Sequence, residues 1–255
     1  MKGIAMNIFD LSGRVAVVTG ASTGLGQGMS LGLAEAGADV VLVDYVPSTE
    51  TESAVRAMGR KSLMLVLDLM KMESISALMA KTLAAFGRVD ILVNNAGIIR
   101  RAPAIDFSEK DWDEVMQLNA KTMFFLSQAA ARDMVPRKRG KIISVASLLA
   151  FQGGILVPSY AASKGAVAQV TKALANEWAQ HGINVNAIAP GYMATNNTKA
   201  LREDANRAQA ILTRIPAGRW GTPDDLKGTV VFLASRASDY VNGHVLVVDG
   251  GWMAR

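Results

Sequence analysis

Residues 14–26 read Arg14-Val-Ala-Val-Val-Thr19-Gly20-Ala-Ser-Thr-Gly24-Leu-Gly26, and this stretch decides the fold. The apolar, β-branched run at its start is typical of a buried strand, and Leu25, Met29 and Leu33 then recur at helical spacing. Glycines between a strand and a helix let the backbone turn tightly and approach a pyrophosphate, although an ordinary tight turn uses the same residues. The position of this loop after the first strand favours a dinucleotide-binding loop.

Six more short apolar runs follow, separated by longer helical patterns, as is typical of strands buried on both faces. With the first run at 14–18, these predicted strands cover residues 39–43, 63–67, 89–93, 141–145, 183–188 and 244–248. Helices are predicted over 25–36, 75–83, 111–135 and 158–180, and Pro223 opens a last one. The alternation favours an α/β fold, a Rossmann-type doubly wound seven-stranded parallel sheet, over a TIM barrel. No linker interrupts the pattern, so residues 1–255 are predicted to form a single domain.

The composition excludes several classes of protein. The chain of 255 residues is 50% hydrophobic and 19% charged, which is typical of a folded domain and not of a disordered one. It has no cysteine and only two histidines, His181 and His244, so we expect no disulfide and no metal site. No apolar run reaches the roughly 18 residues of a membrane span. The first 14 residues lack the apolar stretch of a secretory signal, so we expect a cytoplasmic protein, with Met1 and Met6 both possible starts.

An acidic residue, Asp44, ends the second predicted strand, 18 residues after Gly26. A carboxylate there accepts hydrogen bonds from the hydroxyls of an adenine ribose and repels a 2′-phosphate. No lysine or arginine stands at residues 21–23, and Tyr45 follows Asp44, so the sequence favours NAD over NADP. Asp68 ends the third strand, where it either meets the adenine or caps the next turn.

Four polar residues suggest acid–base chemistry. Tyr160 and Lys164 are four residues apart and therefore share one face of a helix. A neighbouring ammonium stabilises a phenolate and is expected to bring the pKa of the phenol toward the working range. Ser147 follows the fifth strand, where its hydroxyl can hold a substrate oxygen, and the amide of Asn119 can hold a water beside the lysine. Taken singly, each also has an ordinary structural explanation, such as a surface pair or a loop hydroxyl.

Together these motifs make the chain resemble the short-chain dehydrogenase/reductase family over essentially its whole length. The matching stretches are Thr19-Gly20-x-x-x-Gly24-x-Gly26, Asn94-Asn95-Ala96-Gly97, Asn119, Ser147, Tyr160-x-x-x-Lys164 and Pro190-Gly191. The resemblance implies the strand order 3-2-1-4-5-6-7 and a catalytic tetrad of Asn119, Ser147, Tyr160 and Lys164, with Tyr160 as acid and base. It also implies association through the two long helices, commonly as a homotetramer.

The resemblance further implies a set of residues around the cofactor. These are Gly20, Ser22, Thr23, Gly24, Leu25, Gly26, Asp44, Asp68, Leu69, Asn95, Ala96, Gly97, Tyr160, Lys164, Pro190, Gly191, Met193 and Thr195. Lys164 would contact the nicotinamide ribose, and Thr195 the carboxamide.

Within the family, several local stretches are similar to the sugar-acid dehydrogenases that act on 2-keto-3-deoxygluconate or 2-deoxygluconate. Such a substrate carries a carboxylate, which an arginine binds through a bidentate fork. Arg100 or Arg101 is the candidate, with Gln152 and Tyr192 for the sugar hydroxyls beside Ser147 and Tyr160. A surface arginine pair is the ordinary alternative, and Tyr192 can equally pack a lid. Residues 192–215 are predicted to form that lid.

Other functions remain open at this point. On the same scaffold, the alternatives are a polyol dehydrogenase or a 3-oxoacyl-thioester reductase. A dinucleotide-binding regulator without turnover is a third possibility. The charge of +5 suggests nucleic-acid binding as a further alternative. The one dense basic cluster lacks interleaved aromatic residues, however, so no nucleic-acid partner is expected. That cluster comprises Arg132, Arg137, Lys138, Arg139 and Lys141.

Overall fold

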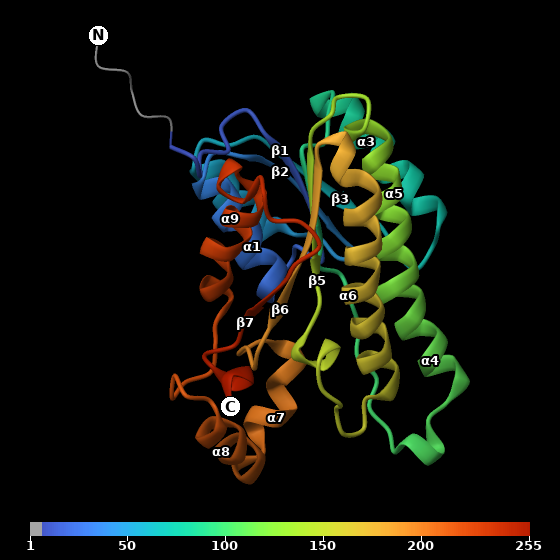
Figure 1. Ribbon diagram of the computed structural model, residues 1–255, viewed down its shortest axis with the longest axis vertical. Coiled ribbons are helices and arrows are strands. Elements are labelled where there is room, and N and C mark those ends of the chain that lie inside the picture. The colour runs from blue at the N-terminus through green and yellow to red at the C-terminus, as the bar shows by residue number, and fades with distance from the viewer. Residues whose placement is uncertain (1–6) are drawn as a thin grey trace.

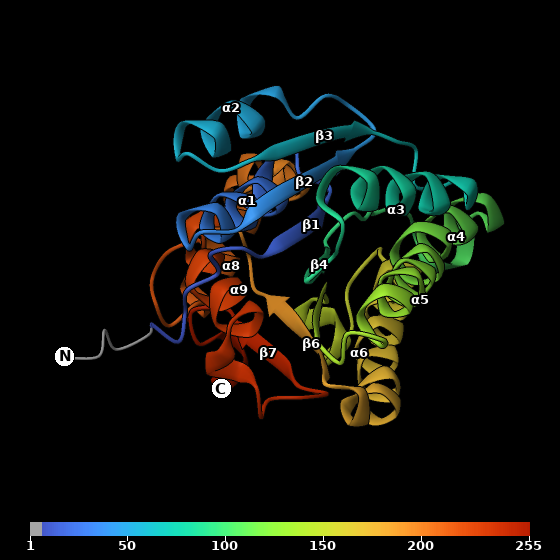
Figure 2. The ribbon, with the colours of Figure 1, turned by 90° about the horizontal axis from the view of Figure 1, so that it is seen from above.

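A computed structural model describes residues 7–255; the two possible starts, Met1 and Met6, lie outside them. Seven strands pair in parallel in one sheet, in the order β3-β2-β1-β4-β5-β6-β7, which confirms the predicted fold and strand order (Figure 2). The strands are β1 (Val15–Thr19), β2 (Asp39–Asp44), β3 (Ser62–Val66), β4 (Ile91–Asn94), β5 (Gly140–Val145), β6 (Ile183–Pro190) and β7 (Val245–Val248). β1 lies between β2 and β4 and is buried along its whole length, as its unbroken apolar run requires.

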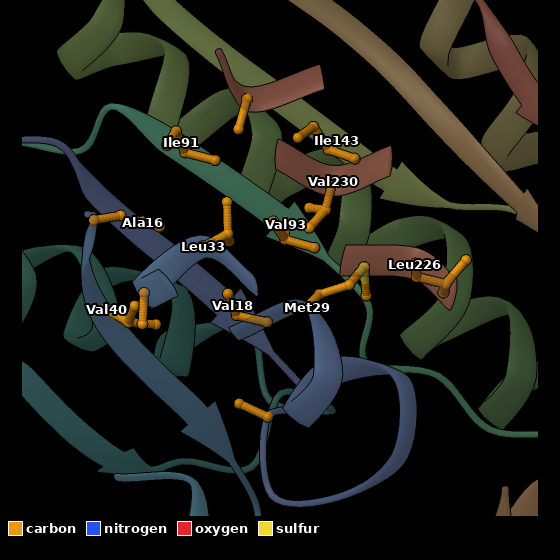
Figure 3. Close-up of a cluster of buried hydrophobic side chains, with 14 of the residues drawn as sticks. Ala16, Val18, Met29, Leu33, Val40, Ile91, Val93, Ile143, Leu226 and Val230 are labelled. Atoms are coloured by element: carbon orange, nitrogen blue, oxygen red, sulfur yellow. The ribbon is translucent and has the colours of Figure 1, made fainter. Parts of the chain in front are cut away.

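The helices cover both faces of this sheet (Figure 2). They are α1 (Gly24–Glu35), α2 (Thr49–Ala57), α3 (Glu73–Phe86), α4 (Glu109–Met116), α5 (Met123–Met134), α6 (Pro158–Trp178), α7 (Lys199–Glu203), α8 (Ala205–Arg214) and α9 (Lys227–Ala234). On one face, Met29 and Leu33 of α1 and Val230 of α9 pack on Val18 of β1 (Figure 3). The opposite face packs against α3, α5 and α6. Within residues 7–255, no helix is long and apolar enough to span a membrane.

The long helix predicted over 111–135 is interrupted. A π-helical turn, Gln117–Thr122, separates α4 from α5 and contains Asn119. The Asn119 side chain bonds to the backbone of Ile98, in the loop after β4, and this tertiary contact accompanies the local change in helix type. A sequence periodicity averages over such a turn, and π turns occur often at functional sites.

At one end of the molecule, α7 and α8 lie together with the C-terminus (Figure 1). Trp252 is buried against Ile211 and Ile215 and against Leu148, which follows β5. The predicted lid segment, 192–215, therefore forms two helices that pack on the chain end.

At the amino ends of the central strands, Asp90 joins three segments of the chain, which begin β1, begin β4 and precede β5. Its carboxylate accepts hydrogen bonds from the Val15 backbone (3.0 Å), from Arg88 Nε (3.0 Å) and from Arg137 Nη1 (3.2 Å). Arg14 Nη1 lies 3.8 Å away, and Asp90 is only 3% exposed. Because several donors surround it, the buried charge is compensated.

We expect Asp90→Ala to lower the free energy of unfolding by about 1–3 kcal/mol, because it leaves the Val15 N–H and the partly exposed Arg88 and Arg137 without their acceptor. Urea denaturation followed by circular dichroism measures this loss. The matched control is Glu203→Ala, which removes an exposed partner of Lys199 and should cost less than about 0.5 kcal/mol. A loss for Asp90→Ala as small as the control's would contradict the role assigned to Asp90.

Candidate active site

The predicted functional residues gather at the carboxyl ends of the strands, where an open α/β sheet binds its ligands. The glycine-rich loop follows β1, Asp44 ends β2, and Asn95–Gly97 follow β4. Ser147 follows β5, and Gly191 follows β6. Parallel pairing brings all these loops to one edge, although they come from distant parts of the sequence.

The loop between β1 and α1 has almost no room for side chains. Gly20 has a φ of +67°, and a Cβ added at Gly26 would lie 1.9 Å from the Gly20 carbonyl oxygen. The side-chain amide of Asn95 donates to the carbonyls of Thr19 (2.9 Å) and Gly20 (3.1 Å). In return, Thr19 Oγ1 accepts from the backbone N–H groups of Asn95 and Ala96, each at 3.0 Å. Backbone groups therefore line this loop at the N-terminus of α1, which suits the pyrophosphate of a dinucleotide. We call the loop, residues 20–26, the cradle.

The Asp44 carboxylate is buried beside this cradle. One oxygen accepts from the Ser22 backbone N–H (3.0 Å) and the other from that of Tyr45 (2.7 Å). Asp68, in contrast, is exposed, and its Oδ1 accepts from the Met70 backbone, so it caps its own turn. Leu69 is buried, and its carbonyl accepts from Thr122 Oγ1.

The residues after β6 face the same cradle. A Cβ added at Gly24 would lie 3.6 Å from Thr195 Cγ2, so Thr195 lies against the glycine-rich loop. Met193 is buried and forms an isolated bridge with Gly221. The predicted cofactor residues on the two loops therefore face one another.

Tyr160 and Lys164 lie one turn apart on α6, near the end of β5. Lys164 Nζ lies 5.5 Å from the centroid of the Tyr160 ring and donates to the Val145 carbonyl at 2.6 Å. Lys164 is 4% exposed, and burial lowers its pKa to about 8. Burial also raises the pKa of Tyr160, while a hydrogen bond with the Ser147 hydroxyl and the Arg101 charge act in the opposite direction.

This result differs from the expectation that Lys164 lowers the pKa of the Tyr160 phenol. Desolvation outweighs the nearby charges, because both groups are removed from water. At neutral pH, Tyr160 is therefore a protonated phenol that can donate a hydrogen bond to a substrate oxygen.

Asn119 makes hydrogen bonds to the loop after β4 and to α6. Its Oδ1 accepts from the Ile98 backbone (2.9 Å), and its Nδ2 donates to the Ile98 carbonyl (2.9 Å) and to Ser163 Oγ (3.1 Å). Both amide hydrogens are used, whereas Oδ1 accepts only one hydrogen bond, so the water predicted beside the lysine stays a prediction. Asn119 fixes the loop after β4 against α6.

A cavity of about 440 Å³ lies between Ser147, Tyr160, the lid and the chain end. Gln152 and Tyr192 line it, and their contact with the substrate stays a prediction. Its charged lining groups are three arginines, Arg101, Arg207 and Arg214, and no carboxylate is among them. No three His, Cys, Asp or Glu side chains within residues 7–255 are grouped as metal ligands.

Arg100 and Arg101 point to different surroundings. Arg100 Nη2 lies 2.8 Å from Glu114 Oε2 and its Nε lies 3.4 Å from Asp111 Oδ1, so it belongs to an ion-pair network with α4 and does not line the cavity. Arg101 does line the cavity, and its Nη2 donates to the Asn197 carbonyl at 3.0 Å. The expectation for Arg100 is therefore corrected, because the sequence did not indicate which of the two would meet the carboxylates of α4.

Among the cavity residues that sequence reasoning missed are Arg207, Arg214 and Trp252. The two arginines are seven residues apart on α8, which places them on one face of a helix. That spacing was visible in the sequence. The contact of Trp252 with the lid was not, because it joins the chain end to a segment some 40 residues earlier.

Because Lys164 is buried, we expect the free energy of unfolding to depend on pH. Between the folded-state pKa of about 8 and the ordinary value of 10.5, the unfolded chain binds more protons than the native state at this group, so stability rises with pH. From pH 7 to 9.5 we expect the wild type to gain about 2 kcal/mol relative to Lys164→Met, which lacks the buried ammonium.

Urea denaturation at several pH values measures this difference. Lys172→Met is the control, because it removes an exposed lysine from the same helix. If the free energies of unfolding of the wild type and Lys164→Met differed by a constant amount across this range, burial of the Lys164 charge would not destabilise the folded state as we expect.

Comparisons with known proteins place this geometry among dehydrogenases. A family model described as "Enoyl-(Acyl carrier protein) reductase" matches residues 20–253. The 2-dehydro-3-deoxy-D-gluconate 5-dehydrogenase of Escherichia coli (strain K12) is 62% identical over 251 residues, covering 98% of this chain and 99% of that protein. A relative of this similarity shares its fold and the positions of its loops.

Two crystal structures extend the comparison. A protein from Agrobacterium tumefaciens, provisionally named a 2-deoxy-D-gluconate 3-dehydrogenase and carrying NADP, is 55% identical with a TM-score of 0.92, covering 98% of this chain and all of that one. A gluconate 5-dehydrogenase from Burkholderia cenocepacia, in complex with NADP and tartrate, is 41% identical with a TM-score of 0.92, covering 97% and 98% of the two chains.

Proposed function

Because the chain belongs to the short-chain dehydrogenase/reductase family, we propose that it interconverts a secondary alcohol and a ketone on a sugar acid, using a nicotinamide dinucleotide. The observation that carries this proposal is the cavity beside the dinucleotide cradle. Ser147 and Tyr160 line this cavity with their hydroxyls, and the charged residues in its lining are all cationic. Such a cavity suits an anionic substrate with a reacting oxygen at one end.

The mechanism follows from the positions of these side chains. Ser147 and Tyr160 hold the reacting oxygen of the substrate between their hydroxyls. In ketone reduction, the Tyr160 phenol gives its proton to that oxygen; in alcohol oxidation, the phenolate takes the proton back. Lys164 lies beside the ring and stabilises the phenolate when it forms. The dinucleotide, when bound in the cradle of Gly20–Gly26, supplies or accepts the hydride.

We expect Tyr160→Phe to lower turnover by roughly 10²- to 10⁴-fold, because it removes only the proton donor and acceptor. The affinity for NADH should stay within about threefold, since the ring and Lys164 remain. Turnover is followed by NADH absorbance and binding by NADH fluorescence.

Tyr240→Phe serves as control, because Tyr240 is fully exposed and far from the cavity. Near-wild-type turnover in Tyr160→Phe would contradict the assignment. A wild type that binds dinucleotide but turns over no substrate would instead support a regulator without catalysis.

For the cofactor, we infer a preference for NAD, supported by the carboxylate of Asp44. It is held beside the cradle by the backbones of Ser22 and Tyr45, so it cannot swing far from the position of an adenine ribose. A 2′-phosphate there would place two like charges within a few ångströms. No lysine or arginine occupies residues 21–23 or 45–48 to offset this repulsion. Because the two related structures carry NADP, the cofactor preference of this chain has to be measured.

We expect kcat/KM for NAD to exceed that for NADP by about 100-fold, which corresponds to about 3 kcal/mol of repulsion. Asp44→Ala should reduce this ratio at least tenfold by improving the use of NADP. Asp39→Ala is the matched control, because it removes the carboxylate at the other end of β2. Equal use of both cofactors by the wild type would contradict the inference.

For the substrate, we propose 2-keto-3-deoxy-D-gluconate or 2-deoxy-D-gluconate and the corresponding keto form. The names of the relatives support a sugar acid but differ in the carbon oxidised, position 5 in one and position 3 in another. A panel of these acids, gluconate, neutral polyols and a 3-oxoacyl thioester separates the proposed activity from the alternatives on the same scaffold.

We also propose a homotetramer in the cytoplasm that does not bind nucleic acid. Members of the basic cluster before β5 have acidic partners, since Arg137 pairs with Asp133 and Lys141 with Asp239, which reduces the charge available to a phosphate backbone. The exposed sides of the two predicted long helices, 111–135 (α4 and α5) and 158–180 (α6), are the proposed association surfaces. Sedimentation tests the oligomeric state.

A further inference from the structure

One face of α8 forms a wall of the substrate cavity. Arg207, Ala210, Ile211 and Arg214 line the cavity at the spacing i, i+3, i+4 and i+7, which brings them onto the same side of the helix. Ile211 is buried and anchors this side against Trp252. The two arginines are therefore presented to the cavity from a fixed base.

Arg214 is oriented by an aromatic platform. Its guanidinium carbon lies 4.0 Å from the centroid of the Trp252 ring. A guanidinium near an aromatic ring is attracted to its face while the N–H donors at its edge remain available to a carboxylate. Within residues 7–255, the Arg214 side chain forms no ion pair with an Asp or Glu.

The platform is itself held in place. Trp252 Nε1 donates to Gln152 Oε1 at 3.3 Å, and the Tyr192 ring lies 4.6 Å from the Trp252 ring. At the chain end, Arg255 Nη2 donates to the carbonyls of Thr213 (3.0 Å) and Arg214 (2.6 Å). Arg255 thereby satisfies acceptors at the C-terminus of α8, where a helix leaves its last carbonyls unpaired.

Arg101 has a different environment. Its Nη2 is already bonded to the Asn197 carbonyl, and its charge acts on the Tyr160 phenol. It therefore lies toward the reacting oxygen. In a sugar acid that reacts at carbon 5, four carbon–carbon bonds separate the carboxylate carbon from the reacting carbon, so a cation beside the phenol is not the one best placed for the carboxylate.

We propose that Arg214, held against Trp252, is the principal cation that binds the substrate carboxylate, and that Arg101 serves the reacting end. This inference rests on the proposed function and deepens it, since it assigns the two ends of the cavity. It makes Trp252 and Arg255 part of substrate recognition, because they hold Arg214 in place.

The test compares 2-keto-3-deoxy-D-gluconate with its primary amide, which keeps the length and hydroxyls and removes the charge. We expect Arg214→Met to lower kcat/KM for the acid by about 10- to 100-fold, the range of a charge-assisted hydrogen-bonded pair, and to change the value for the amide less than threefold. Methionine keeps an apolar contact with Trp252. Arg214→Lys should retain part of the activity on the acid, because it keeps the charge without the fork.

Lys199→Met is the control, because it removes an exposed cation from the same lid without lining the cavity. Arg101→Met should reduce kcat/KM on both compounds. NADH affinity and circular dichroism establish that each variant is folded.

Two outcomes would overturn the assignment of Arg214. One is an equal loss on acid and amide for Arg214→Met; the other is a loss restricted to the acid for Arg101→Met with none for Arg214→Met. In both cases the wild type remains active and the proposed function stands. A wild type that turns over neither compound nor any other sugar acid of the panel, with NAD or NADP, overturns the proposed function together with this inference.

Discussion

The hydrogen bonds between Asn95 and the end of β1 hold the two central loops of the sheet together. Asn95 donates to the carbonyls of Thr19 and Gly20, and Thr19 accepts from the loop that follows β4. A glycine-rich loop has little side-chain packing of its own, so its shape depends on such partners. The same loop after β4 continues to Ile98, where Asn119 connects it to the helix layer. The cofactor cradle and the catalytic helix are therefore joined through one continuous set of bonds.

The second constraint is the exclusion of water around the reacting groups. Lys164 is buried with a single backbone acceptor, and Tyr160 is a phenol whose charged form burial disfavours. Neither arrangement favours the folded state by itself. Both arrangements suit a site whose charge changes during each turnover. Away from water, a small change in the surrounding charge has a large effect on the proton affinity of each group. The free energy of folding is thus less favourable at the residues that react.

Most of the fold could be predicted from the sequence because it depends on local patterns. Short apolar runs marked every strand, and the glycines after the first run marked the cradle. Tyr160 and Lys164 share one side of α6 as their spacing predicted, while the catalytic roles of the tetrad stay a prediction. The failures concern contacts that only tertiary structure decides. Arg100 and Arg101 are adjacent and alike, and they separate because Glu114 and Asp111 lie on the side of Arg100. Likewise, the role of Trp252 depends on two segments that no sequence period connects.

The π-helical turn at Gln117–Thr122 has a consequence for the tolerance of the chain to insertions and deletions. Removing one residue from this turn would close it into an ordinary α-helical turn, because a π turn is an α-helical turn with one extra residue. Leu126, Ala130 and Met134 of α5 could then keep their places against the sheet. The residues inside the turn would change direction, and the amide of Asn119 would leave the Ile98 backbone. A deletion in α5 itself would instead rotate its apolar face by about 100° away from the sheet.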